Sequence, residues 1–201
     1  MRVGYFGGTF DPPHAAHLRA AQMAADALAL DVVLMAPTGI QPLKDDTPHA
    51  SFADRMAMVR LLCAEDDRLK VTALDAPRED GSPNYTVTAL EAVRQEYPGA
   101  EIFVVVGADS FLSLPRWHEP HRLLAEAAWI VLSRPGSDLD DLSELKLSPK
   151  EMERIHLLRD MDDDLSATSI RERLRLGISC GQMLTTKVAL YIAKMHLYHA
   201  R

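Results

Sequence analysis

The sequence predicts an α/β protein with a Rossmann-like, doubly wound parallel sheet and helices on both faces. Three observations support this prediction. Short, continuously apolar runs, typical of strands buried on both faces, alternate along the chain with helical patterns. The 201 residues suit one domain, and the chain contains no internal repeat and no low-complexity segment. We therefore expect a single domain over residues 1–201 that closes with C-terminal helices.

The predicted strands are short runs rich in β-branched and aromatic residues. The first, Arg2–Phe6, runs directly into a glycine turn. The others are expected at Asp31–Ala36, Leu69–Leu74, Ile102–Val106, Trp129–Ser133 and, as a last short strand, Ile155–Leu158. Trp129 lies inside a strand and is expected in the core.

The predicted helices fill the intervals between strands and close the chain. The first follows the glycine turn, and its Leu18–Leu30 part is rich in Ala and Leu. A second, Ser51–Ala64, has Ser51 as a candidate N-cap and one apolar face with Met56, Val59, Leu62 and Cys63. Further helices are expected at Tyr85–Tyr97, Ala108–Leu114, His121–Ala127, Thr168–Leu176 and Thr185–Leu197. Residues 135–147 are interpreted as a polar surface connection, and 160–164 as a solvated loop.

The composition excludes several classes of protein. Hydrophobic residues make up 47% and charged residues 25% of the chain, as in ordinary globular proteins. The net charge of −7 and the scattered basic residues argue against a nucleic-acid partner. Cys63 and Cys180 are too few for a disulfide framework or a cysteine metal site. With no apolar run of membrane-spanning length and no signal peptide, we expect no membrane partner and a location in the cytoplasm.

The N-terminal stretch RVGYFGGTFDPPHAAH carries the strongest functional signal. Gly7 and Gly8 let backbone N–H groups approach a ligand, and the helix that follows favours an anion at its N-terminus. His14 and His17 are three residues apart, so their rings are expected on one helix face, where they could hold a phosphate from two sides. A zinc site is the alternative, although only Asp11 lies nearby as a third ligand.

Polar residues follow several predicted strands, at the edge where ligands bind in open α/β sheets. His14, Lys44, Asp109 and Arg134 each come after a different strand and are expected to converge on one crevice. Lys44, in a loop with Pro and Gly, is a candidate phosphate ligand. Asp109 could accept hydrogen bonds from ribose hydroxyls, or it could cap the short helix after it.

Two further segments are candidate binding elements. In LPRWHEPH, Trp117 stands beside Arg116 and His118 and could stack on a flat ring. In PNYTVTAL, Asn84 or Thr86 could cap the helix.

LSATSIRER opens the penultimate helix and combines capping hydroxyls with a cation. Ser166 and Thr168 are candidate caps, and Arg171 lies one turn further on. Together these residues describe a second anion site.

The stretch GGTFDPPHAAH resembles the G-x-F-D-x-x-H-x-x-H signature of the nucleotidyltransferase superfamily, with Ala16 where that family usually has glycine. PNYTVTAL, GADS, LPRW, SRPG and LSATSIRER follow in the order found in the nicotinate mononucleotide adenylyltransferase family, with Ala167 in place of a serine. The resemblance implies transfer of AMP from ATP to nicotinate mononucleotide, with release of pyrophosphate and a requirement for Mg²⁺.

The resemblance also implies roles for individual residues. His14 and His17 would bind phosphates and stabilise the transition state, with Lys44 and Arg171 neutralising charge. The remaining ATP-binding residues would be Gly7, Gly8, Thr9, Phe10, Asp109, Arg134, Ser166 and Thr168. The pyridine nucleotide would contact Tyr85, Thr86, Trp117 and His118. No protein side chain is expected to be a metal ligand.

Other functions stay open at this point. A sibling adenylyltransferase would use nicotinamide mononucleotide or phosphopantetheine, although Trp117 and the Tyr85–Thr86 pair suit a flat pyridine ring. A non-catalytic nucleotide sensor would bind ATP without turnover, and a metal hydrolase built on the histidine pair is a third reading. Assembly into a homo-oligomer is also open.

Overall fold

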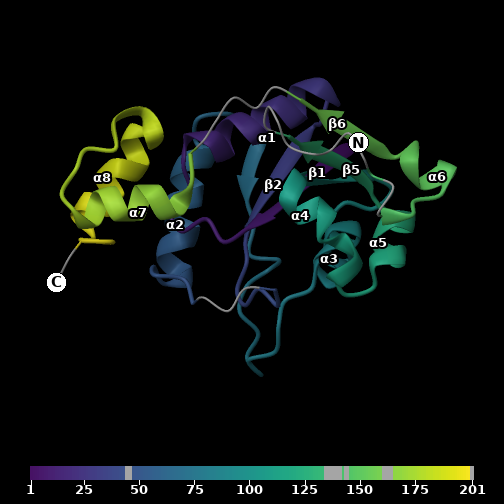
Figure 1. Ribbon diagram of the computed structural model, residues 1–201, viewed down its shortest axis with the longest axis horizontal. Helices are drawn as coiled ribbons and strands as arrows, with labels where there is room; N and C mark the ends of the chain where they lie inside the picture. Colours follow the sequence, from purple (N-terminus) through teal and green to yellow (C-terminus); the bar gives the residue numbers. More distant parts are fainter. Residues whose placement is uncertain (44–46, 134–141, 143–144, 160–164, 200–201) are drawn as a thin grey trace.

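The structure is a computed structural model that describes residues 1–43, 47–133, 142, 145–159 and 165–199. Its centre is a six-stranded parallel sheet with the strand order β3-β2-β1-β4-β5-β6 (Figure 1). The strands are β1 (Arg2–Gly8), β2 (Val32–Pro37), β3 (Leu69–Val71), β4 (Glu101–Gly107), β5 (Ala128–Leu132) and β6 (Ile155–Leu158). The strand order reverses between β1 and β4, which places the expected ligand crevice at their carboxyl ends.

The helices cover both faces of the sheet. They are α1 (Ala15–Ala27), α2 (Phe52–Cys63), α3 (Thr86–Glu96), α4 (Ala108–Leu112), α5 (Pro120–Glu126), α6 (Pro149–Met152), α7 (Ala167–Arg175) and α8 (Thr186–Lys194). Short 3₁₀ turns lie at Leu114–Arg116 and Gly181–Met183. In Figure 1, α7 and α8 lie beside α2 at one end of the molecule, and β6 and α6 lie at the other.

Alternate residues of each strand face two separate cores. In β1, Phe6 packs with α1, α2, α7 and α8, whereas Val3 and Tyr5 pack with α3, α4 and α5. Trp129 is fully buried in the second core, as expected. The doubly wound fold class predicted from the sequence is confirmed.

The element boundaries differ from expectation in a few places. Helix α1 begins at Ala15 with His14 as its N-cap, and it ends at Ala27, three residues before the end of the Ala- and Leu-rich stretch. Strand β3 stops at Val71, and the Leu74 N–H bonds to the Thr72 hydroxyl instead of continuing a ladder. Helix α6 was not predicted, although Ser148 and Glu151 form its capping box. Most of the expected connection over 135–147, and the loop at 160–164, lie outside the described residues.

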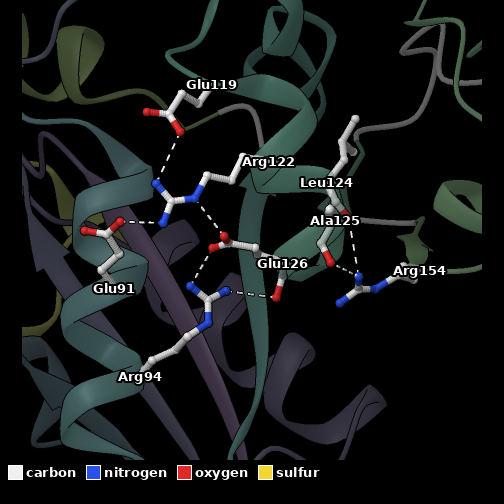
Figure 2. Close-up of polar contacts among 8 residues, drawn as sticks. All are labelled: Glu91, Arg94, Glu119, Arg122, Leu124, Ala125, Glu126 and Arg154. Carbon is white, nitrogen blue, oxygen red and sulfur yellow. Dashed lines mark hydrogen bonds and ion pairs between the residues drawn. The ribbon is translucent and has the colours of Figure 1, made fainter.

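A cluster of ion pairs joins α3 to α5 (Figure 2). Arg122 contacts Glu91, Glu119 and Glu126, and Arg94 reaches the Glu126 carboxylate at 2.6 Å and its main-chain oxygen at 3.0 Å. Each of these partly exposed ion pairs contributes little to stability alone. The cluster matters here because the segments that begin these two helices line the same cavity, and it holds the helices in one relative position.

Among the described residues, no helix is both long enough and apolar enough to cross a membrane.

Candidate active site

Two cavities open at the carboxyl ends of the central strands. The larger, about 810 Å³, lies over the β1–α1 loop and the start of α7, and the smaller, about 570 Å³, lies over the starts of α3 and α5. They share a wall made of Gly7, Thr38, Gln41, Val106, Asp109 and Ser110. Residues from both halves of the sheet form this wall, so ligands in the two cavities would lie next to each other.

The loop after β1 forms the floor of the larger cavity. Gly7, Gly8 and Thr9 line it, as predicted. Phe10 has a φ of 50°, a left-handed conformation that is costly for a bulky residue and persists only where surrounding packing holds it. Its buried ring makes edge contacts with Phe6 (5.6 Å between centroids) and His17 (4.8 Å). The packing of the Phe10 ring against these two rings therefore holds the loop after β1 in place.

The two histidines lie together at the start of α1, as the spacing predicts. Their ring centroids are 3.8 Å apart, and both residues line the larger cavity. The main-chain N–H of His14 donates to His17 Nδ1 at 3.2 Å, and this hydrogen bond fixes the orientation of the His17 ring. His14 is only 5% exposed. Two imidazoles held in this way beside a helix N-terminus suit a phosphate ligand.

The start of α7 forms the opposite side of the larger cavity. Ser166 is the N-cap and accepts a hydrogen bond from the Ser169 N–H at 3.1 Å. The prediction that Thr168 is also a cap is wrong, since its hydroxyl accepts from Arg171 at 3.2 Å. Arg171 Nη1 also donates to the Asp11 main-chain oxygen at 2.8 Å. Arg171, although far along the chain, is thereby held beside the loop that precedes His14.

Arg55 of α2 is a site residue that the sequence analysis missed. It is 2% exposed, and its Nη1 donates to the main-chain oxygens of Thr9 (2.7 Å) and Thr38 (2.9 Å). Burial lowers the pKa of its guanidinium, while Asp11, Tyr198 and Asp75 counteract that shift. Arg55 therefore ties the loop after β1 to the loop after β2, and both loops line the larger cavity.

Aromatic residues dominate one side of the smaller cavity. Tyr85, Thr86, Trp117 and His118, the four residues predicted to contact a pyridine nucleotide, all line it. The rings of Tyr85 and His118 are stacked at 4.2 Å. Trp117 Nε1 donates to the Ser113 hydroxyl at 3.0 Å, and the indole meets Trp129 edge-on at 5.9 Å. These contacts fix the Trp117 ring while leaving it half-buried at the cavity.

Asn84 connects two loops around the smaller cavity rather than capping α3. Its Oδ1 accepts from the Ile40 N–H at 2.9 Å, and its Nδ2 donates to the Ala76 oxygen at 2.8 Å. The residue at the N-cap is Tyr85, without a side-chain cap, so the predicted caps Asn84 and Thr86 are both wrong. At Gly39 a Cβ would lie 2.5 Å from the Pro77 nitrogen, so the two loops approach each other as closely as they do only because residue 39 is glycine.

Asp109 lies on the wall that the two cavities share, with an exposed side chain. The N-cap of α4 is Gly107, so the alternative reading of Asp109 as a cap is wrong. Lys44, the candidate phosphate ligand, and Arg134, a predicted ATP-binding residue, lie outside the described residues.

Asp75 is a buried carboxyl group on the smaller cavity. Burial raises its pKa from 3.8 to about 6, while hydrogen bonds from the Thr38 and Tyr5 hydroxyls and the charge of Arg55 partly offset that shift. Because this pKa is higher in the folded chain, the folded chain binds more protons between about pH 4 and about pH 6. Ionisation of Asp75 therefore lowers stability as the pH rises through this window.

We expect an Asp75→Asn variant to lose this pH dependence. Relative to wild type, its free energy of unfolding should rise by up to about 3 kcal/mol between about pH 4 and about pH 7. Urea unfolding of both proteins across this range measures the difference. The exposed Asp67→Asn serves as the control for the substitution itself, and a difference for Asp75→Asn that does not change with pH would contradict the raised pKa.

The fold and the paired cavities define a nucleotide-binding α/β protein, and comparison with known proteins identifies its class. The chain belongs to the cytidylyltransferase-like family, whose model matches residues 5–173. Within that class, it belongs with the nicotinate-nucleotide adenylyltransferases. It is 38% identical to a Herpetosiphon aurantiacus protein over the full length of both chains, and 35% identical to a Rubrobacter xylanophilus protein over all of this chain and 93% of the relative. Both relatives carry the name "Probable nicotinate-nucleotide adenylyltransferase".

Solved structures share the fold at low sequence identity. The Plasmodium falciparum nicotinic acid mononucleotide adenylyltransferase complexed with APC superposes with a TM-score of 0.78 at 17% identity, covering 98% of this chain and 96% of that one. The same enzyme complexed with NaAD gives a TM-score of 0.77 at 18% identity, covering 98% of this chain and 97% of that one.

Proposed function

We propose that this protein is a nicotinate-nucleotide adenylyltransferase that transfers AMP from ATP to nicotinate mononucleotide. The observation that carries the proposal is the pair of cavities with one shared wall. The larger is lined by two histidines and Arg171, and the smaller by Trp117 and Tyr85. ATP is assigned to the first and the pyridine nucleotide to the second. The full-length relatives named for this activity support the same assignment.

The reaction is an in-line displacement at phosphorus. A phosphate oxygen of nicotinate mononucleotide attacks the α-phosphorus of ATP, and the bond from that phosphorus to the oxygen bridging to the β-phosphate breaks. Pyrophosphate leaves, and nicotinate adenine dinucleotide is formed. A phosphate monoester has a second pKa of about 6 and is mostly dianionic at neutral pH, so no general base is needed.

Catalysis therefore depends on positioning two anions and neutralising their charge. His14 and His17 would hold phosphate oxygens from one side of the larger cavity, and Arg171 with Thr168 from the other. Backbone N–H groups after β1 would add donors. Asp109, at the shared wall, would bind the adenosine ribose. In the other cavity Trp117 would stack on the pyridine ring.

In the proposed reaction, Mg²⁺ would be bound to the triphosphate of ATP. Mg²⁺ prefers oxygen ligands and keeps several waters, so a complex with phosphate oxygens suits a cavity lined by histidines, a hydroxyl and an arginine. The described part of the chain has no group of three or more His, Cys, Asp or Glu side chains arranged to hold a metal ion. The chain's own contribution is to bind the phosphates that carry the ion. Cys63 and Cys180 are free thiols, which fits the proposed location in the reducing cytoplasm.

Pyrophosphate release tests the proposal directly. The protein is mixed with Mg-ATP and, in separate reactions, with nicotinate mononucleotide, nicotinamide mononucleotide and phosphopantetheine. Fast release with nicotinate mononucleotide alone is the expected result. Release with phosphopantetheine alone would reassign the chain to a sibling enzyme. ATP binding without release in any reaction would support a nucleotide sensor instead.

Trp117→Ala should weaken binding of the pyridine nucleotide specifically. Loss of the aromatic stack is expected to raise KM for nicotinate mononucleotide about tenfold. KM for ATP should stay within about twofold, because Trp117 does not line the larger cavity. Trp117→Phe, which keeps an aromatic face, should recover most of the loss. Equal increases in both KM values would contradict the stacking role and point to a general loss of fold.

A further inference from the structure

The C-terminal turn of the chain contacts Asp11, a residue that lines the larger cavity. After α8, the Leu197 N–H bonds back to the Ile192 oxygen at 3.1 Å, and the chain turns toward the loop after β1. Tyr198 has a φ of 65°, which is costly for a side-chain-bearing residue and persists where other contacts hold it. Its ring packs against the core, and its hydroxyl donates to Asp11 Oδ1 at 2.7 Å.

Asp11 is the meeting point of four segments of the chain. Asp11 is 3% exposed, and its carboxylate accepts from the main-chain N–H groups of His49 at 2.7 Å and Ala50 at 3.0 Å, in the segment before α2. Its main-chain oxygen accepts from Arg171 of α7. Tyr198 adds the C-terminal turn, and Asp11 itself belongs to the loop before His14.

The contact between Tyr198 and Asp11 has the character of a strong hydrogen bond. Burial raises the pKa of the Tyr198 hydroxyl, and the hydrogen bond to Asp11 raises it further. The hydroxyl group therefore keeps its proton. A protonated hydroxyl facing a carboxylate is a charge-assisted pair, and such pairs are shorter and stronger than neutral ones.

We propose that Tyr198 is a positioning residue for the ATP cavity, acting through Asp11. Its hydroxyl fixes the Asp11 carboxylate, and the Asp11 main chain in turn holds Arg171 at the cavity beside His14. Tyr198 touches no substrate in this arrangement. The inference rests on the proposed function and adds that the C-terminal turn sets how well the phosphate ligands are placed.

The effect should be confined to one substrate. Asp11, His14 and Arg171 line the larger cavity, and none of them lines the smaller one. Loss of the Tyr198 hydroxyl should therefore impair ATP binding and turnover while leaving the pyridine nucleotide unaffected.

The chain supplies a matched control on α8. Tyr191 also donates its hydroxyl to a carboxylate, Asp54 Oδ1, at 2.9 Å. Neither Tyr191 nor Asp54 lines the larger or the smaller cavity. Tyr198→Phe and Tyr191→Phe thus each remove one tyrosine–carboxylate hydrogen bond and keep the ring, but only the first contact leads to the site.

The experiment compares steady-state kinetics, affinity for a non-hydrolysable ATP analogue by calorimetry, and thermal unfolding of the two variants. For Tyr198→Phe we expect kcat/KM for ATP and analogue affinity to fall about tenfold, with KM for nicotinate mononucleotide unchanged. Tyr191→Phe should match wild type within about twofold in every binding and kinetic value. Tyr198→Phe should unfold at a lower temperature than Tyr191→Phe, because the Asp11 carboxylate is buried and the Asp54 carboxylate is only half-buried, and both variants should be folded at the assay temperature.

Equal behaviour of the two variants in analogue binding would overturn the inference, as would an equal change in both KM values for Tyr198→Phe. The analogue measurement separates this outcome from failure of the proposed function. A wild-type protein that binds the analogue without turnover would refute the reaction, while the difference in affinity between the two variants would still decide the role of Tyr198.

Discussion

Replacing His14 by alanine should lower kcat for adenylyl transfer about 100- to 1,000-fold while the chain stays folded. His14 is buried at the start of α1 and lines the larger cavity, where a ring nitrogen can donate to phosphate oxygens as charge shifts onto them. Such donors act most strongly where water is excluded, because water does not screen them. Pyrophosphate release at saturating substrates measures the effect.

A histidine remote from the cavities provides the control. His121 lies exposed on α5, and His121→Ala should keep turnover within about twofold of wild type. Circular dichroism and thermal unfolding report whether His14→Ala retains the fold, with a cost of about 1 kcal/mol expected at an N-cap position. Turnover of folded His14→Ala near the wild-type value would remove this residue from the catalytic assignment.

Arg55→Met should lower the free energy of unfolding by about 2–4 kcal/mol, because the oxygens of Thr9 and Thr38 lose their buried donor. Methionine retains the apolar stem and much of the volume, so the change isolates the guanidinium. ATP affinity should fall together with stability, since the two loops that Arg55 joins both line the larger cavity. Urea unfolding and calorimetry with an ATP analogue measure the two effects.

Arg60, on the exposed side of the same helix, is the matched control for Arg55. Arg60→Met should change the free energy of unfolding by no more than about 0.5 kcal/mol. If Arg55→Met changed the free energy of unfolding equally little, the oxygens of Thr9 and Thr38 would be bonded to other donors in the variant. The hydrogen bonds from Arg55 would then not be what stabilises the two loops.

The architecture could be predicted from the sequence because each element carries a local signal. The continuous apolar runs at β4 and β5 indicate strands buried on both faces, and the alternation with helices implies parallel connections. Boundaries were less accurate where distant contacts compete with local ones. The side chain of Asn84 looks like a helix cap in the sequence, but it bonds to Ile40 and Ala76 from other segments.

The candidate site was predictable where a residue stands in a recognisable motif, and less so where its role depends on tertiary contacts. His14, Trp117 and Arg171 belong to such motifs and line the cavities at the carboxyl ends of the strands, although one crevice was expected and two cavities are present. Arg55 carries no local signal, since an arginine in an amphipathic helix normally faces solvent. The predicted apolar face of that helix even placed Met56 inward, whereas Met56 is half-buried and Arg55 is buried. Only the assembled sheet brings the main-chain oxygens of Thr9 and Thr38 close enough together for Arg55 to donate to both.

The wall shared by the two cavities has a practical consequence for inhibitor design. Two weak ligands, one in each cavity, would lie on opposite sides of Gly7, Thr38 and Asp109. A short linker over that wall would turn the second binding event into an intramolecular one, with an effective concentration in the millimolar range or above. Fragments found separately for each cavity could thus be joined into a single tight binder without any new contact to the protein.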